Sequence, residues 1–309
     1  MKISILTTTY KRPFLLKRLA ESVIPLINKL DGQLDWRIII DDDTDDNYDT
    51  ILDEIDQKVK NKNLLNWKKH KNIGKFRSLN KLFNNKSNSD WLVNIDDDDL
   101  IINYKFEDFI QHLSSIKKDV KAIIVPRLIL NIPFYHFRVN KKIKFFSKYK
   151  NQKMSYFQFK EKIGDFDTTI FVRKSTYFVK KYKEVENDKF TPESLRWLDA
   201  YPENDMLILN QVLTYSQYLE DGITKFTDKN RILNYKSTIL TYKKFLEFKK
   251  FNLSLILIKS LVNYYRFSFH SSKKINFFDE RQRSIIFFIC YVLGKFLFLY
   301  DRIIFKKKG

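Results

Sequence analysis

The chain has 309 residues, of which 44% are hydrophobic and 16% aromatic, enough to build a sizeable core and to exclude a disordered protein. It has 57 Lys and Arg residues against 37 Asp and Glu, a formal charge of +20. We therefore expect its surface to attract polyanions such as phosphorylated substrates, nucleic acid or anionic lipid. The single cysteine, Cys290, excludes an intramolecular disulfide framework and a multi-cysteine metal site.

The first 30 residues predict a strand followed by a helix. Residues 2–8 are mostly β-branched and apolar, as in a buried strand. Apolar residues at helical spacing from Phe14 to Val23 predict a helix that begins near Pro13 and ends at Pro25. The N-terminal apolar run is too short for a signal peptide and no small-residue cleavage pattern follows it. We therefore expect the chain to start in the cytosol.

Further apolar runs continue an alternation of strands and helices. The sequence predicts a helix at residues 76–82, and strands at 36–40, 64–69, 90–95, 120–126 and 168–174. This order is typical of an α/β fold with a mainly parallel sheet and right-handed crossovers. Ligands of such sheets bind beyond the carboxyl ends of the strands.

Two clusters of aspartates follow two of these strands. One comprises Asp96, Asp97, Asp98 and Asp99; the other comprises Asp41, Asp42, Asp43, Asp45 and Asp46. Two carboxylates about 4 Å apart repel by about 4 kcal/mol at an effective dielectric near 20, so a tight cluster needs protons, water or a cation. One interpretation is a solvated acidic turn that caps a helix beginning near Tyr104. The recurrence of the cluster in a basic chain favours a site for Mn²⁺ or Mg²⁺, completed by substrate phosphates.

Three segments in order, within residues 4–101, carry a family resemblance: SILTTTYKRPFLLKRLAESV, IIIDDDTDD and NIGKFRSLNKLFNNKSNSDWLVNIDDDDLI. They resemble the opening strand and turn, the Asp-Asp-Gly-Ser strand end and the Asp-x-Asp-Asp region of family 2 glycosyltransferases. Asp43 and Thr44 stand in place of Gly and Ser, and Asp97 is an additional acid.

The resemblance implies a GT-A fold over residues 1–235, a Rossmann-like, mainly parallel sheet flanked by helices. It also implies a metal-dependent, inverting enzyme that moves a sugar from a nucleotide diphosphate, expected to be UDP. The acceptor would be a hydroxyl of a saccharide or lipid-linked saccharide in cell-surface glycan synthesis.

By matched position, the resemblance implies a nucleotide-sugar site. Its residues would be Thr8, Tyr10, Asp42, Asp96 and Asp97, with Asp42 at the base.

Asp98 and Asp99 would hold the metal, Mn²⁺ or Mg²⁺. Lys75 and Arg77 follow Gly74, where cationic side chains are expected to meet the diphosphate. An ordinary exposed, basic helix start is the alternative for those two residues.

Direct attack on the sugar requires a carboxylate that takes the proton of the acceptor hydroxyl. The segment WLDAYPENDMLILNQVL resembles the late acidic motif of the family, so Asp205 is the first candidate for this base and Glu203 the second. The alternative is that both acids only cap a predicted helix at residues 206–213. Asp165 and Asp167 are weaker candidates.

Residues 236–309 form a basic extension. Residues 241–309 contain 15 Lys and Arg against 4 Asp and Glu, interleaved with large apolar residues. The apolar run from Ile285 is shorter than the 20 or so residues of a spanning helix. We expect an amphipathic helix that binds an anionic membrane surface, with the protein peripheral on the cytoplasmic face of the cell membrane. A spanning or re-entrant helix and packing against the catalytic domain are the alternatives.

Three classes of function account for different parts of the sequence. A glycosyltransferase explains both aspartate clusters and the basic residues near them. A non-catalytic membrane-associated protein with a degenerate GT-A fold explains the extension but not the aspartates. A nucleic-acid-binding protein explains the charge, yet its acidic clusters would repel a phosphate backbone. We therefore predict the transferase and no nucleic-acid partner.

Overall fold

The computed structural model describes residues 1–44, 47–82, 88–130, 135–179, 181–217, 227–248, 254–271 and 285–306. Asp45 and Asp46 of the predicted second cluster lie outside these residues. The main sheet contains β1 (Ile3–Thr9), β2 (Leu34–Ile40), β3 (Leu65–Lys69), β4 (Trp91–Asn94), β6 (Ala122–Pro126), β8 (Lys153–Met154), β9 (Thr168–Arg173) and β10 (Met206–Ile208). Its strand order is β3-β2-β1-β4-β9-β6-β10-β8.

The sheet is mainly parallel. Strand β1 pairs in parallel with β2 and β4, and β2 pairs with β3. Strand β9 is antiparallel to its neighbours β4 and β6, while β10 is parallel to β6. The predicted α/β class is therefore confirmed, and each of the six predicted strands is present with nearly the expected bounds.

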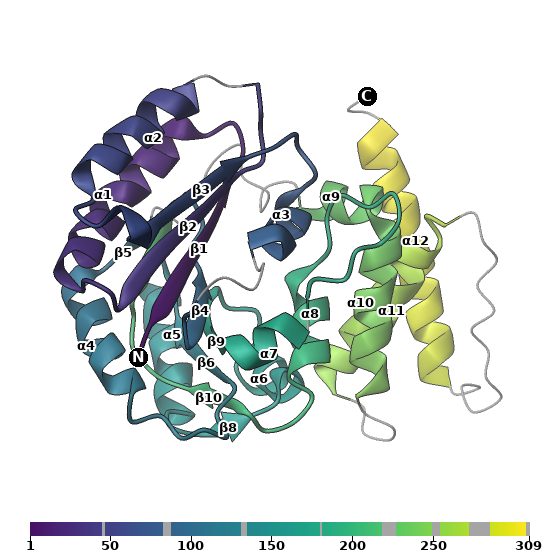
Figure 1. Ribbon diagram of the computed structural model, residues 1–309. Coiled ribbons are helices and arrows are strands. Elements are labelled where there is room, and N and C mark those ends of the chain that lie inside the picture. Colours follow the sequence, from purple (N-terminus) through teal and green to yellow (C-terminus); the bar gives the residue numbers. More distant parts are fainter. Residues whose placement is uncertain are drawn as a thin grey trace.

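Helices cover both faces of the sheet because the strands alternate their side chains between two cores. Ile3 and Ile5 of β1 belong to the core under α1, α2 and α4, whereas Leu6 belongs to the core under α3, α6 and α8. Figure 1 shows α1, α2 and α4 on one side of the sheet and α3 on the other. The helices of this part of the chain are α1 (Pro13–Lys29), α2 (Asn47–Lys58), α3 (Lys75–Leu82), α4 (Asn103–Leu113), α5 (Tyr135–Lys148), α6 (Tyr156–Lys162), α7 (Lys174–Val179) and α8 (Glu193–Ala200).

The prediction that the first helix ends at Pro25 is wrong, because α1 continues through Pro25 to Lys29. An interior proline costs a helix about 3 kcal/mol or more. Buried residues on both sides of it, Val23, Ile24, Leu26 and Ile27, pack against the sheet and offset this cost.

The predicted helix at residues 206–213 is also wrong. Residues 206–208 form strand β10, whose Met206 pairs with Ala122 of β6, and the segment after it is not helical. A short apolar run does not distinguish a helix from a buried strand by periodicity alone.

A second, three-stranded sheet begins at Asp99, the last residue of the Asp96–Asp99 cluster. It has the order β5-β11-β7, with β5 at Asp99–Ile101, β7 at Leu128–Leu130 and β11 at Thr214–Gln217. Helix α4 follows β5 and its N-cap residue is Ile102, with no side-chain cap. The aspartates therefore do not cap the helix near Tyr104, and the capping interpretation of this cluster is wrong.

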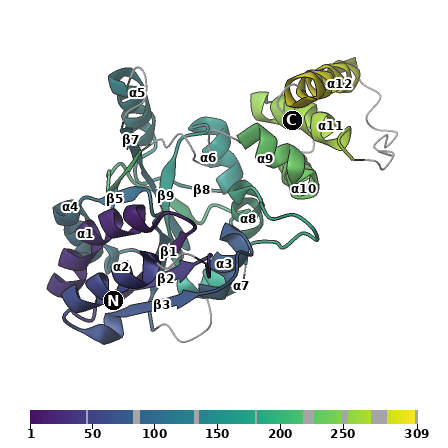
Figure 2. The same cartoon turned by 90° about the horizontal axis from the view of Figure 1, so that it is seen from above.

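The C-terminal region is helical, as expected. It contains α9 (Thr227–Leu233), α10 (Tyr235–Glu247), α11 (Leu255–Ser268) and α12 (Ile285–Lys306). Helix α10 packs on α8, and Phe248 stacks on Phe157 of α6 with ring centroids 5.6 Å apart. Helix α12 packs on α11 at the outer side of the molecule (Figures 1 and 2). Among the described residues, no helix is both long and apolar enough to cross a membrane.

Candidate active site

The ends of several strands meet at one edge of the main sheet. Strands β1, β4 and β6 run in the same direction, so the residues after them lie at this edge. Strand β9 runs the other way, and its first residue, Thr168, pairs with Pro126 at the end of β6. This register brings Asp96, Arg127 and Asp167 to a pocket of about 950 Å³.

Two acids of the Asp96–Asp99 turn point inward and hold the turn in place. Asp97 accepts a hydrogen bond of 2.7 Å from Thr9 Oγ1, and burial raises the pKa of its carboxyl to about 7. The Asp99 side chain is fully buried, 3.1 Å from Arg127 Nη1, and accepts a hydrogen bond from Ser216. The structure thus places Asp99 beneath the pocket, although Asp97 still lines its wall.

The other two acids of the turn, Asp96 and Asp98, are partly exposed and line the pocket. Asp96 lies 2.8 Å from Lys75 Nζ. Burial raises the pKa of Asp96, but Lys75 and Arg127 outweigh it and hold the pKa below its usual value. Burial and the neighbouring Asp96 raise the pKa of Asp98. Of these two acids, Asp98 is therefore the one whose ionised form is disfavoured by the neighbouring negative charge.

These two carboxylates fit a hard divalent cation. Within the described ranges, no group of three or more His, Cys, Asp or Glu side chains is arranged to hold a metal ion by itself. Mg²⁺ is commonly bound by one or two carboxylates together with substrate phosphates and water. A cation beside Asp98 would also relieve the repulsion that raises its pKa. The donor set is thus that of a metal site completed by a substrate.

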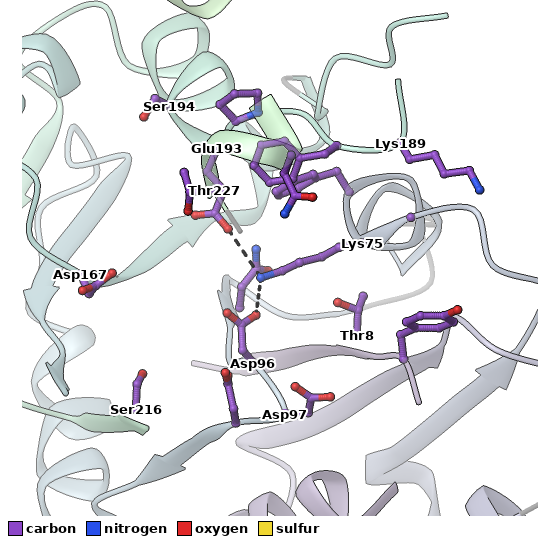
Figure 3. A pocket seen from close by; sticks show the side chains of 18 of the residues that line it. Thr8, Lys75, Asp96, Asp97, Asp167, Lys189, Glu193, Ser194, Ser216 and Thr227 are labelled. Atoms are coloured by element: carbon purple, nitrogen blue, oxygen red, sulfur yellow. Dashed lines mark ion pairs between the residues drawn. The ribbon is translucent and has the colours of Figure 1, made fainter. Parts of the chain in front are cut away.

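Lys75 connects the aspartate turn to a third acid. Its Nζ lies 2.8 Å from Asp96 and 3.8 Å from Glu193 Oε1, as Figure 3 shows. Burial lowers the pKa of Lys75, but the two carboxylates outweigh burial and raise it well above its usual value. Lys75 is therefore a fixed positive charge in the pocket. Glu193 is the first residue of α8 and its side chain is about half exposed to the pocket (48%).

The loop before Lys75 is held by Asp41. Its carboxylate accepts hydrogen bonds of 2.9 Å from the backbone N–H groups of both Ile73 and Gly74. Gly74 has φ +94°, and a Cβ at this position would lie 2.5 Å from the backbone oxygen of Lys189. Only glycine fits both the backbone conformation and the close approach.

We expect Gly74→Ala to lower stability by about 1–3 kcal/mol, because it adds a clash to a strained backbone, and to weaken binding at the pocket. Gly32→Ala is the matched control, since Gly32 has φ +77° and nothing within 4 Å of the added Cβ. Thermal unfolding of the two variants separates the cost of the clash from that of positive φ. Equal destabilisation of both would contradict a tight contact at Lys189.

One carboxylate oxygen of Asp42 is available as a hydrogen-bond acceptor. Its Oδ1 accepts hydrogen bonds from Thr44 N and Thr44 Oγ1, at 3.0 and 2.7 Å. Its Oδ2 is buried and has no hydrogen-bond partner among the described residues. Asp42 itself is 3% exposed and, unlike Asp41, is not among the residues that line the pocket. Burial raises the pKa of Asp42, but the bonds from Thr44 outweigh it, so the carboxyl has a pKa below its usual value. An ionised, unpartnered oxygen of this kind suits an N–H donor of a ligand.

The remaining predicted residues of the donor site divide into two groups. Thr8 and Tyr10 line the pocket, and the Tyr10 side chain is 44% exposed. Arg77 is turned away: it donates to the backbone oxygen of Val185 at 3.2 Å and lies 3.8 Å from Glu184. The structure does not bring Arg77 to the pocket, and Arg127, which the sequence analysis missed, stands there instead.

The structure also separates Asp205 and Glu203 from the aspartates. Asp205 precedes β10 and its backbone oxygen accepts from Lys121 N at 2.9 Å, at the start of β6. Its carboxylate lies 2.9 Å from Lys121 Nζ. Because β6 and β10 are parallel to β4, their first residues lie at the opposite edge of the sheet from Asp96. Both acids are within the described residues and neither lines the pocket.

The pocket continues onto the C-terminal helices. Its lining there includes Thr227, Asn230, Arg231, Leu233 and Asn234, from α9 and the residue after it. Asp167 and Lys160 also line this pocket. The pocket is therefore longer than the aspartate site alone, and the region before the predicted domain boundary at residue 235 forms part of it.

Comparisons with known proteins identify the family and the fold. A family model described as glycosyl transferase family 2 matches residues 4–178, more than half of the chain. No curated protein matches the chain. The solved structure of S. aureus TarS 1-349 with UDP-GlcNAc has a TM-score of 0.56 and 13% identity, covering 95% of this chain and 79% of that one.

A second solved structure gives the same result. The mannosyltransferase PcManGT from Pyrobaculum calidifontis, in complex with GDP-Man and Mn²⁺, has a TM-score of 0.55 and 10% identity. The alignment covers 97% of this chain and 87% of that chain. At these identities the likeness concerns the fold, and it confirms the predicted GT-A architecture.

Proposed function

The chain belongs to glycosyltransferase family 2, and we propose that it is a metal-dependent, inverting enzyme that uses a UDP-sugar. The acceptor is a hydroxyl of a saccharide or lipid-linked saccharide in cell-surface glycan synthesis. The observation that carries this proposal is the arrangement of Asp96, Asp98 and Lys75 on one wall of the pocket. Two carboxylates beside a fixed cation suit a divalent ion and a diphosphate together.

The nucleotide base is assigned to the end of the pocket near β1 and β2. Thr8 and Tyr10 line that end, and the free Oδ2 of Asp42 follows β2. Uracil presents an N–H donor that suits this oxygen. The TarS structures contain UDP and UDP-GlcNAc, which supports uridine, whereas the PcManGT structure contains GDP-Man.

We expect Asp42→Asn to weaken UDP binding about tenfold, since the hydrogen bond it removes involves a charged acceptor. Titration of UDP by calorimetry at a fixed Mn²⁺ concentration measures the change. Asp43→Asn is the matched control, because Asp43 is exposed and adjacent. Unchanged affinity in Asp42→Asn would place the base elsewhere.

The diphosphate is assigned to the centre of the pocket. When bound, a divalent ion acts there as a Lewis acid on the departing phosphate oxygens. Asp98 would hold this ion, with Asp96 beside it. Lys75, kept charged by Asp96 and Glu193, contributes a second positive charge toward the leaving group. Arg127 stabilises the turn from below through Asp99.

Glu193 replaces Asp205 as the proposed general base. It is a pocket acid at the start of α8, close to Lys75 and on the opposite side of it from Asp96 (Figure 3). In an inverting reaction the acceptor oxygen attacks the anomeric carbon from the face opposite the diphosphate. Glu193 takes the proton of that hydroxyl as the new bond forms and the sugar–phosphate bond breaks. Asp167, also in the pocket, is the second candidate.

The acceptor is assigned to the end of the pocket formed by α9. Asn230 and Arg231 of α9 line this end. Their side chains offer hydrogen-bond donors suited to sugar hydroxyls and to an anionic acceptor group.

The test is release of sugar from a panel of UDP-sugars and GDP-sugars, with Mn²⁺ or with a chelator. We expect at least one UDP-sugar to be turned over only when the metal is present. Metal-independent turnover would contradict the role of the aspartate pair, and preferred use of GDP-sugars would contradict the base assignment.

A further inference from the structure

Helix α12 presents an apolar face to solvent. Its exposed apolar side chains include Phe288, 65% exposed, and Phe296, 70% exposed. The full set is Ile285, Phe288, Ile289, Val292, Leu293, Phe296, Leu299, Tyr300 and Ile303. Their spacing of three and four residues places them on one side of the helix. The helix has 22 residues and is about 33 Å long, and the apolar face extends over most of its length.

The opposite face of α12 carries its buried charge. Asp301 is 2% exposed and accepts hydrogen bonds of 2.8 and 2.6 Å from Nε and Nη2 of Arg266 on α11. His270 Nε2 lies 3.1 Å from the same carboxylate. Burial raises the pKa of Asp301, but Arg266 and His270 hold it below its usual value.

A close helix contact fixes the orientation of α12 as well. A Cβ added at Gly294 would lie 2.7 Å from Tyr265 Cβ and 2.8 Å from the backbone oxygen of Val262. Cys290 is buried on the same side. Large residues on this side, including Phe287 and Tyr291, pack against the α11 cluster as well. These contacts together fix the rotation of α12, and they leave its other apolar side chains directed outward.

Basic residues border the apolar face. Lys295 lies three residues after Val292 and four before Leu299, and Arg302 lies three residues after Leu299. Both are exposed. Asp301, the one acidic residue in the sequence of α12, is buried against Arg266. The exposed side of this helix is therefore apolar and cationic without an acid to balance it.

We propose that the exposed face of α12 docks the protein on an anionic membrane, with Phe288 and Phe296 among the acyl chains and Lys295 and Arg302 at the lipid headgroups. An apolar helix face bordered by cations suits the boundary between acyl chains and anionic headgroups. Figures 1 and 2 place α12 at the outside of the molecule, with α11 between it and α10. The helix lies along the membrane and does not cross it.

A membrane fits this face better than a second copy of the chain. Two copies joined through α12 would each bring Lys295 and Arg302 to the interface, and the exposed side of the helix has no acidic residue to pair with them. Anionic headgroups supply the missing charge, at about 1 kcal/mol per basic residue near the surface. Charge complementarity thus selects the lipid surface.

The proposal extends the proposed function by naming where the acceptor is met, and it is tested without turnover. The purified full chain is mixed with phosphatidylcholine vesicles or with vesicles that also contain phosphatidylglycerol, and bound protein is measured by flotation. We expect binding to the anionic vesicles that weakens as salt is added. Absence of binding to both would overturn the proposal.

Two pairs of variants locate the surface. We expect Phe288→Asp with Phe296→Asp, and separately Lys295→Glu with Arg302→Glu, each to weaken binding to anionic vesicles by about tenfold or more. Phe14→Asp is the control for the first pair, since Phe14 is 75% exposed on α1. Lys117→Glu with Lys118→Glu, both exposed, controls for the second. Circular dichroism checks the fold of each variant.

Light scattering distinguishes the alternative occupant. A wild-type dimer that becomes a monomer in Phe288→Asp with Phe296→Asp, without vesicle binding, would identify the face as a self-interface and overturn the proposal. Donor turnover separates this outcome from failure of the proposed function, since both α12 variants should still consume the donor at the wild-type rate in the absence of lipid.

Discussion

Replacing Asp98 with Asn is expected to remove the dependence of donor turnover on Mn²⁺ and to lower the rate by about 10³-fold. A Lewis acid at the leaving group contributes several kcal/mol, and each 1.4 kcal/mol or so is a factor of ten in rate. Of the acids of the turn that line the pocket, Asp98 is the one that forms no ion pair with the described residues. The measurement is initial rate against Mn²⁺ concentration.

The control for this change is Asp43→Asn, which removes an exposed carboxylate from the other cluster. It should keep both the rate and the metal dependence. Thermal unfolding of Asp98→Asn should stay close to wild type, because the substitution relieves the crowding beside Asp96. A variant that retains full stimulation by Mn²⁺ would show that the ion is bound by other residues.

Replacing Glu193 with Gln is expected to lower kcat by about 10²–10⁴-fold while UDP affinity changes by only a few fold. General-base catalysis contributes a factor of this size, and Gln keeps the shape of the side chain without its ability to take a proton. Steady-state kinetics measures kcat, and calorimetric titration measures the affinity for UDP.

Asp205→Asn is the contrasting variant. Asp205 pairs with Lys121, whose side chain is 47% exposed, at the far edge of the sheet. We expect kcat within a few fold of wild type and a stability change of about 0–1 kcal/mol. Loss of turnover in Asp205→Asn with normal turnover in Glu193→Gln would reverse the assignment.

The first half of the fold was predictable because its signals are local. Strands β1, β2 and β4 are apolar runs that end in polar residues, and parallel strands bring their ends to one edge. The aspartate turn could therefore be assigned to a site. Which acids face the pocket could not be predicted. Asp97 and Asp99 are turned inward by contacts with Thr9 and Arg127, and both of these partners are far away in the sequence.

The assignment of the base depended on secondary structure that the sequence left ambiguous. Met206–Ile208 is too short an apolar run to separate strand from helix, and reading it as a helix placed Asp205 at a helix start. The actual helix start carries a signal that was missed: Pro192 and Glu193 precede Leu195 and Leu198 at helical spacing.

For helix α12, too, one part of the structure was predictable from the sequence and another part was not. Its apolar run and nearby cations are visible in the sequence, but the direction in which the apolar side chains face is not. That direction is set by Arg266 and Tyr265 of α11, which pair with Asp301 and pack against Gly294. Tyr291 also packs on Tyr265, so the apolar residues of α12 divide between this inner contact and the exposed face.

The most direct test of the central claim is calorimetric titration of UDP into the wild-type protein, with Mn²⁺ and with a chelator. We expect binding that requires the metal, because Asp96 and Asp98 repel a diphosphate unless a cation lies between them. Metal-independent binding would contradict this arrangement of the site, and binding of neither UDP nor GDP under either condition would contradict a nucleotide-sugar transferase altogether.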